Sequence, residues 1–160
     1  GEGPEFRRLK KMAKSNIYFV GYQPDEMVQE YYRFCLSFIM PQEEDFGITP
    51  IEAFSYGKPV LALKRGGALE YVEEGINGEF FDAPVAEVLA DGVRRLKENL
   101  SHYDPEKIKK TAERFSKEKF KMEILRFMTK IWKQPSKRVR WSMKWWGKSS
   151  MQCMPKMAWS

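Results

Sequence analysis

Apolar and polar residues follow two different rhythms along the chain. Runs in which apolar residues recur every three or four positions predict helices, and short runs that are apolar throughout predict strands covered on both faces. Helices are expected over residues 4–15, 24–35 and 68–74, and strands over residues 16–20, 36–40, 59–64 and 79–81. Gly75, Asn77 and Gly78 mark a turn before the last of these strands. Strands that alternate with helices predict parallel pairing with right-handed crossovers.

Two further helices are predicted after the last strand. Their apolar residues lie at helical spacing, namely Val85, Leu89, Val93, Leu96 and Leu100 in the first, and Phe120, Ile124, Phe127, Met128 and Ile131 in the second. The predicted fold class is therefore α/β, with a Rossmann-like parallel sheet flanked by helices. Beyond Trp132 the pattern ends, and residues 133–160 are expected to form an appendage without a periodic apolar face.

The positive charge of the chain is concentrated in that tail. The 160 residues carry a formal net charge of +6, but seven of the 28 Lys and Arg residues lie from Lys133 onward, where no acid occurs. Subtracting those seven leaves 21 basic against 22 acidic residues in the first 132, a net charge of −1. Four of the five tryptophans also lie in the tail. Any membrane or nucleic-acid function would therefore reside there.

Three interpretations of the tail remain open. A basic helix with tryptophans can lie on an anionic membrane surface. The same side chains can stack on single-stranded nucleic acid. The third interpretation, a disordered or foreign extension, is favoured, and no nucleic-acid partner is expected. Cys35 and Cys153 suggest no disulfide framework, and no apolar run approaches the ~20 residues of a membrane span. The expected location is the cytoplasm or the periphery of a membrane.

The stretch EEDFGITPIEAFSYGKP (residues 43–59) contains two carboxylates eight positions apart, Glu44 and Glu52. One interpretation of this stretch is purely structural. Residues 49–52 fit a capping box, with Thr49 as the N-cap, a proline at the first helical position, and Glu52 bonding back to the Thr49 amide. In that interpretation Glu44 is an ordinary loop acid.

A second interpretation of the same stretch involves a ligand. Gly47, just ahead of the predicted helix, lets a ligand approach the backbone. The first N–H groups of a helix point outward and favour an anion such as a diphosphate. Parallel α/β sheets bind ligands at the carboxyl ends of their strands. Glu44 and Glu52 would then flank the phosphates and accept hydrogen bonds from the hydroxyls of a sugar and a ribose.

This part of the chain resembles the donor-binding segment of a large retaining glycosyltransferase family, glycosyltransferase group 1 or family 4, whose members have two Rossmann-like domains (the GT-B fold). The resemblance covers about residues 1 to 130. Its matches are GEGPE, IYFVGY, the Glu-x7-Glu pair at Glu44 and Glu52, Phe46-Gly47, Glu52-Ala53, Gly57-x-Pro59-Val60, Gly66-Gly67 and Gly75-x-Asn77-Gly78. Residues 45–50 look most like the mannosyltransferase branch.

The resemblance implies a role for each matched position. Glu44 would be the catalytic carboxylate, in contact with the hydroxyls of the transferred sugar. The other donor-binding positions would be Phe46, Gly47, Ile48 and Thr49, whose backbone contacts sugar and diphosphate, and Glu52, which binds the ribose. Val20, Gly21 and Tyr22 would meet the nucleobase, largely through the main chain. Neither a cofactor nor a metal ion is expected, and the donor would be GDP-mannose or a UDP-sugar.

The expected organisation is a nucleotide-sugar-binding domain over residues 1–132, incomplete at its N-terminus, and the tail over 133–160. The family's N-terminal domain and its basic diphosphate-binding pair have no match here, so the fragment alone is expected to be inactive. Lys64 and Arg65 are expected to be a solvated loop pair. Two alternatives remain: a nucleotide-sugar epimerase of the same fold, and a non-catalytic binding or scaffold protein that acts through its basic tail.

Overall fold

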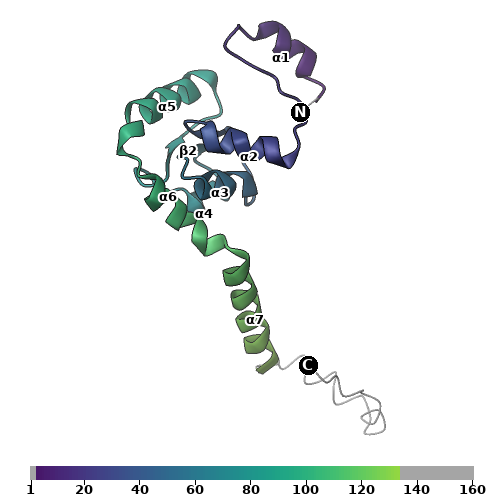
Figure 1. Ribbon diagram of the computed structural model, residues 1–160, viewed down its shortest axis with the longest axis vertical. Coiled ribbons are helices and arrows are strands. Elements are labelled where there is room, and N and C mark those ends of the chain that lie inside the picture. The colour runs from purple at the N-terminus through teal and green to yellow at the C-terminus, as the bar shows by residue number, and fades with distance from the viewer. Residues whose placement is uncertain (1–2, 134–160) are drawn as a thin grey trace. The chain divides into compact units, whose positions relative to one another are not determined.

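A computed structural model describes residues 3–133 of the chain, and its sheet has three parallel strands. The strands are β1 (Phe38–Met40), β2 (Val60–Leu63) and β3 (Gly78–Phe81), in the spatial order β1-β2-β3. Ile39 pairs with Leu61 across the first two strands, and Leu61 pairs with Glu79 across the second two. The predicted parallel sheet is therefore confirmed, and Figure 1 shows helices on both sides of β2.

The predicted helices occur in the predicted order, those over residues 4–15, 24–35 and 68–74 with shorter bounds, and α6 (Pro105–Ala112) is a helix that was not predicted from the sequence. The helices are α1 (Phe6–Met12), α2 (Asp25–Phe34), α3 (Ile48–Ser55), α4 (Ala68–Tyr71), α5 (Ala86–Glu98), α6 (Pro105–Ala112) and α7 (Lys117–Lys133), with 3-10 turns η1 (Leu100–His102) and η2 (Glu113–Phe115). α6 begins in the expected way for its sequence, because the Asp104 carboxylate accepts a hydrogen bond from the Glu106 amide at 2.9 Å and Pro105 needs no amide partner.

The chain divides into two compact units, residues 1–115 and residues 116–160. The sheet, its covering helices and all predicted site residues belong to the first unit. Of the second unit the structure describes α7, where the predicted helix is confirmed. The tail beyond it, with its predicted membrane-surface contact, lies outside the described residues. No helix within residues 3–133 has the length and apolar character needed to cross a membrane.

The core is built around β2, all four residues of which are buried. α5 covers one face of the sheet, where Gly92 lies so close to the side chains of Leu61 and Phe81 that a Cβ on it would sit 3.0 Å from a Leu61 methyl group. From α3, Ala53 and Phe54 are fully buried. A sheet covered on both faces needs apolar residues at every position of its central strand, which explains the unbroken run in β2.

The predicted strand over residues 16–20 is wrong. The segment forms no strand, and the side chains of Ile17, Tyr18 and Val20 are 53%, 83% and 47% exposed. A strand requires a neighbour that satisfies its amide and carbonyl groups, and none of the three described strands pairs with this segment. β1 is also less buried than predicted, since it is an edge of the described sheet and Ile39 is 39% exposed.

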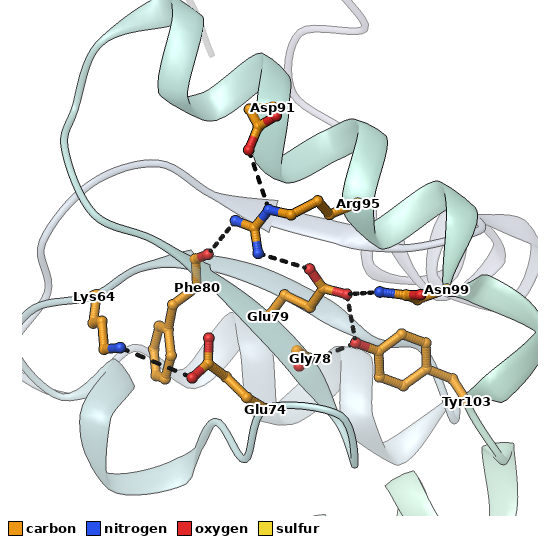
Figure 2. A network of polar contacts seen from close by, with 9 residues as sticks. All are labelled: Lys64, Glu74, Gly78, Glu79, Phe80, Asp91, Arg95, Asn99 and Tyr103. Atoms are coloured by element: carbon orange, nitrogen blue, oxygen red, sulfur yellow. Dashed lines mark hydrogen bonds and ion pairs between the residues drawn. The ribbon is translucent and has the colours of Figure 1, made fainter.

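A buried carboxylate attaches β3 to α5 and the turn that follows it. Figure 2 shows Glu79 pointing toward Arg95, Asn99 and Tyr103. Glu79 accepts hydrogen bonds from Arg95 at 3.3 Å, from Asn99 at 2.9 Å and from Tyr103 at 3.2 Å. Arg95 also donates to the Phe80 carbonyl oxygen at 2.9 Å. A charge buried on an apolar sheet is tolerated because each carboxylate oxygen has a donor.

Replacing Tyr103 by Phe is expected to lower the free energy of unfolding by about 1 kcal/mol. The change removes only the hydroxyl, which lies 3.2 Å from Oε1 of Glu79 and 3.1 Å from the Gly78 carbonyl oxygen. Glu79 keeps two of its donors, so the loss stays moderate. Urea unfolding of both proteins measures the difference, and equal midpoints would show that the hydroxyl contributes nothing.

Candidate functional site

The loop between β1 and α3 carries the first of the two carboxylates and ends at an unusual backbone position. Gly47 precedes α3 with φ +78°, a left-handed conformation that favours glycine. The space around it is also closed to a side chain, because a Cβ on Gly47 would lie 2.9 Å from the Tyr71 hydroxyl oxygen and 3.3 Å from the Met40 sulfur. Gly47 is therefore required by both conformation and space.

The predicted capping box is wrong. α3 begins at Ile48, so Thr49 is its second residue and Glu52 its fifth, and no side chain caps the helix. The helix starts earlier because Gly47, and not Thr49, makes the turn into the helix. Pro50 is tolerated as the third residue, since the first amides of a helix have no partner within it. With no acid in the first turn of α3, its amide groups face no negative side chain from the helix itself.

Glu52 is held by a different residue, on a different helix. The Tyr32 hydroxyl donates to Oε2 of Glu52 at 3.0 Å and lies 3.4 Å from the Thr49 carbonyl oxygen. Burial, followed by the hydrogen bond to Glu52, raises the pKa of Tyr32 well above its usual value, so the hydroxyl remains a donor. The Glu52 side chain is exposed, so its carboxylate remains open to a ligand.

A hollow of about 410 Å³ lies between α2 and α3, with Glu52 in its wall. Its lining residues are Asp25, Val28, Gln29 and Tyr32 from α2, and Glu52, Ser55 and the adjoining Tyr56 from α3. Tyr32 and Tyr56 stack in this wall, with ring centroids 5.7 Å apart and an angle of 18° between the ring planes. Aromatic walls with a few polar groups are typical of sites for small organic ligands.

The glycine pair Gly66-Gly67 supports the loop that carries Glu44. The Gly67 amide donates to the Glu44 carbonyl oxygen at 2.8 Å. A Cβ on Gly67 would overlap the Asp45 carbonyl oxygen, and a Cβ on Gly66 would overlap the Glu44 carbonyl oxygen. The two loops that follow β1 and β2 are therefore in backbone contact, which only glycine permits.

An aromatic cluster also anchors the same loop. The Phe46 ring packs edge-on against Tyr71 and Phe115, with centroid distances of 6.0 and 5.6 Å. Burial, and after it the charge of Glu44, raises the pKa of Tyr71 to about 12. The Glu44 side chain itself is exposed and accepts a hydrogen bond from Gln42 at 3.3 Å. The loop is thus fixed through its backbone and Phe46, while the carboxylate points to solvent.

The structure brings most of the predicted site residues to one end of α3. Gly47, Ile48 and Thr49 form its start, and the anchored loop with Glu44 and Phe46 directly precedes it. Helix amides that no side chain caps and an exposed glutamate can together receive a molecule that has both anionic and hydroxyl groups. Glu52 lies a turn further along, at the hollow.

The predicted nucleobase segment lies just before α2 and does not line the hollow. Tyr22 is 88% exposed, and the Val20 carbonyl oxygen accepts a hydrogen bond from Gln23 at 2.5 Å. Gly21 has φ +65°, so the chain turns there. Val20 and Tyr22 are exposed and Gly21 is half-exposed, and among residues 3–133 no hydrogen bond joins these three to Glu52.

Sequence reasoning missed one residue of the site, Tyr32, and gave an expectation for Lys64. Tyr32 was not identified, because its partner lies 20 positions away and no local pattern links the two. Lys64, expected to be solvated, lies 3.8 Å from the Glu74 carboxylate at the surface. A pair this exposed contributes little to stability, in agreement with the expectation.

The similarity of this chain to a known protein family extends over most of its length. A model of the family described as glycosyl transferases group 1 matches residues 1–135. Lipopolysaccharide 1,2-N-acetylglucosaminetransferase of Salmonella typhimurium is 32% identical over 135 residues, which cover 79% of this chain and 35% of that protein. Alpha-1,3/1,6-mannosyltransferase ALG2 of Saccharomyces cerevisiae is 51% identical over 39 residues, which cover 24% of this chain and 8% of that protein.

Solved structures share the fold of this chain. Sucrose-phosphate synthase from Thermosynechococcus elongatus matches it with a TM-score of 0.71 and 22% identity, over 81% of this chain and 35% of that one. HepE of Anabaena in complex with UDP-glucose matches with a TM-score of 0.66 and 23% identity, over 78% of this chain and 36% of that one. The match thus spans only about a third of the first curated relative and of these solved chains. Since the family model covers residues 1–135, this chain belongs to the glycosyl transferases group 1 family.

Proposed function

We propose that this chain binds a nucleoside-diphosphate hexose at the start of α3 and serves as the donor-binding part of a retaining glycosyltransferase. The observation that carries the proposal is the loop with Glu44, fixed by Gly67 and Phe46 directly ahead of a helix start with no side-chain cap. Family membership supports it. The transfer itself is proposed for the whole protein, because the chain spans about a third of its first relative.

The diphosphate would lie against the first amides of α3. These amides carry partial positive charge and have no acidic side chain beside them in the first turn of the helix. Gly47 would allow the phosphates to approach the backbone. This arrangement would stabilise the leaving diphosphate without a metal ion.

The two carboxylates would have separate tasks. Glu44, exposed on the anchored loop, would accept hydrogen bonds from hydroxyls of the hexose and act as the catalytic carboxylate. Glu52, at the hollow, would accept hydrogen bonds from the ribose. Val20, Gly21 and Tyr22, accessible ahead of α2, would meet the nucleobase. Carboxylates suit both tasks, because a charged acceptor forms stronger bonds to vicinal hydroxyls than a neutral one.

The donor base and sugar are proposed from the named relatives. The HepE structures contain UDP and UDP-glucose, and the mannosyltransferase ALG2 shares a short but closely similar stretch. A UDP-sugar and GDP-mannose are therefore the donors to test first.

We expect UDP-glucose or GDP-mannose to raise the melting temperature of the isolated chain by several degrees at saturating concentration, because a ligand that binds only the folded state stabilises it. Thermal unfolding with increasing ligand measures the affinity. Glucose and mannose without nucleotide serve as controls and should have no effect. Unchanged melting with every sugar nucleotide would contradict the proposal and favour a binding or scaffold protein.

A further inference from the structure

Tyr32 is a buried tyrosine that lines the hollow and donates a hydrogen bond to an exposed carboxylate. Its side chain is only 8% exposed, whereas Glu52, to which it donates, is open to solvent beside the hollow. The 3.0 Å bond between them joins α2 to α3 across 20 positions of sequence. The bond therefore lies at the edge of the hollow where a ligand would meet Glu52.

The Tyr32 hydroxyl has little freedom to move. Its ring stacks on Tyr56 at 5.7 Å and contacts Phe38 at a centroid distance of 5.9 Å. The Thr49 carbonyl oxygen also lies 3.4 Å from the hydroxyl oxygen. A rigid donor of this kind restricts the rotamers of the carboxylate that it contacts.

We infer that Tyr32 is a positioning residue for ribose recognition, which holds one oxygen of Glu52 so that the carboxylate meets the ribose diol already oriented. The inference rests on the proposed function. A free exposed glutamate would lose rotamer entropy when a ligand binds, whereas a restrained one has lost it beforehand. A carboxylate offers about four acceptor positions on its two oxygens, so the bond to Tyr32 leaves room for two ribose hydroxyls.

The competing interpretation is a bond that only ties α2 to α3. The two interpretations differ in what the hydroxyl affects. A bond that only ties helices together stabilises the fold, and its removal changes the affinity for all ligands equally. A bond that orients Glu52 affects only ligands that have the ribose hydroxyls, and only while Glu52 is present.

The test is Tyr32→Phe, which keeps the ring and its stacking and removes the hydroxyl. Calorimetric titration of the whole chain uses UDP, GDP and their 2′,3′-dideoxy counterparts as probes. We expect the affinity for UDP or GDP to fall by about twofold to tenfold, with no change for the dideoxy counterpart. In a Glu52→Ala background, Tyr32→Phe should cause no further loss, because its effect passes through Glu52.

Tyr103→Phe is the matched control. It also removes a buried hydroxyl from a carboxylate, at 3.2 Å, but Tyr103 lies outside the hollow. It should destabilise the fold and leave the nucleotide affinity unchanged. Equal affinity of Tyr32→Phe and the wild type for whichever of UDP and GDP binds, or equal losses for that nucleotide and its dideoxy counterpart, would overturn the inference. A wild-type chain that binds neither UDP nor GDP would instead overturn the proposed function, and the inference with it.

Discussion

Glu52→Gln is expected to weaken nucleoside-diphosphate binding about tenfold to a hundredfold. This loss corresponds to about 1.4–2.8 kcal/mol, the range of a hydrogen bond to a charged group. The fold should lose little stability, because the side chain is exposed and the Gln carbonyl oxygen can still accept from Tyr32. The ribose hydroxyls would lose a charged hydrogen-bond acceptor. Calorimetric titration with UDP and GDP measures the affinity, and urea unfolding confirms the stability.

Glu44→Gln is the comparison that separates the two carboxylates. Its side chain lies on the loop before α3, away from the lining of the hollow. This variant should bind the bare nucleoside diphosphate normally and lose affinity only for the sugar-bearing donor. Normal nucleotide binding by Glu52→Gln, or equal losses for both variants with the bare diphosphate, would rule out the assignment of ribose and hexose to separate acids.

Gly67→Ala is expected to lower the free energy of unfolding by about 1–3 kcal/mol and to weaken sugar-nucleotide binding about tenfold or more. Gly67 has ordinary helical angles, φ −61° and ψ −22°, so alanine adds no backbone strain of its own. Its Cβ would lie 2.7 Å from Cα of Phe46 and would overlap the Asp45 carbonyl oxygen. The loop must move to admit the methyl group, and Glu44 and Gly47 move with it.

Gly92→Ala is the matched control for this substitution. A methyl group there meets side-chain atoms of Leu61, at 3.0 and 3.3 Å, and no backbone of the site loop. Donor affinity should stay at the wild-type value, whatever the change in melting temperature. If Gly67→Ala also keeps the wild-type affinity, measured below its melting transition, the glycine pair does not position the donor site.

The sequence predicted those parts of the fold whose signal is local. β2, β3 and α5 were located to within a residue or two, because an unbroken apolar run or a helical repeat reflects burial directly. The start of α3 was misplaced by two residues, since no local sequence pattern shows that Gly47 adopts φ +78° and turns the chain ahead of Thr49. Residues 16–20 failed for a different reason: an apolar run is compatible with a strand but does not supply the strand that must pair with it.

For the candidate site, the resemblance suggested the residues but not the contacts that hold them together. The family resemblance marked Gly66 and Gly67, yet the reason for two adjacent glycines is a backbone contact with the loop that follows β1. That contact joins segments some 20 positions apart. The hydrogen bond from Tyr32 to Glu52 is equally distant in sequence, and it forms only after two helices have packed. Sequence patterns within a short window contain information on neither contact.

The loop before α3 is held by main-chain contacts and by the Phe46 ring, which has a consequence for protein engineering. The carbonyl of Glu44 and the amide of Gly67 fix its path, whereas Ile48 is 67% exposed and the Asp45 side chain has no hydrogen-bond partner among the described residues. Positions 45 and 48 can therefore be randomised without disturbing the scaffold. Under the proposed function, the side chains at these two positions would influence donor choice while other atoms hold the loop, so a small combinatorial library there would test for altered sugar preference.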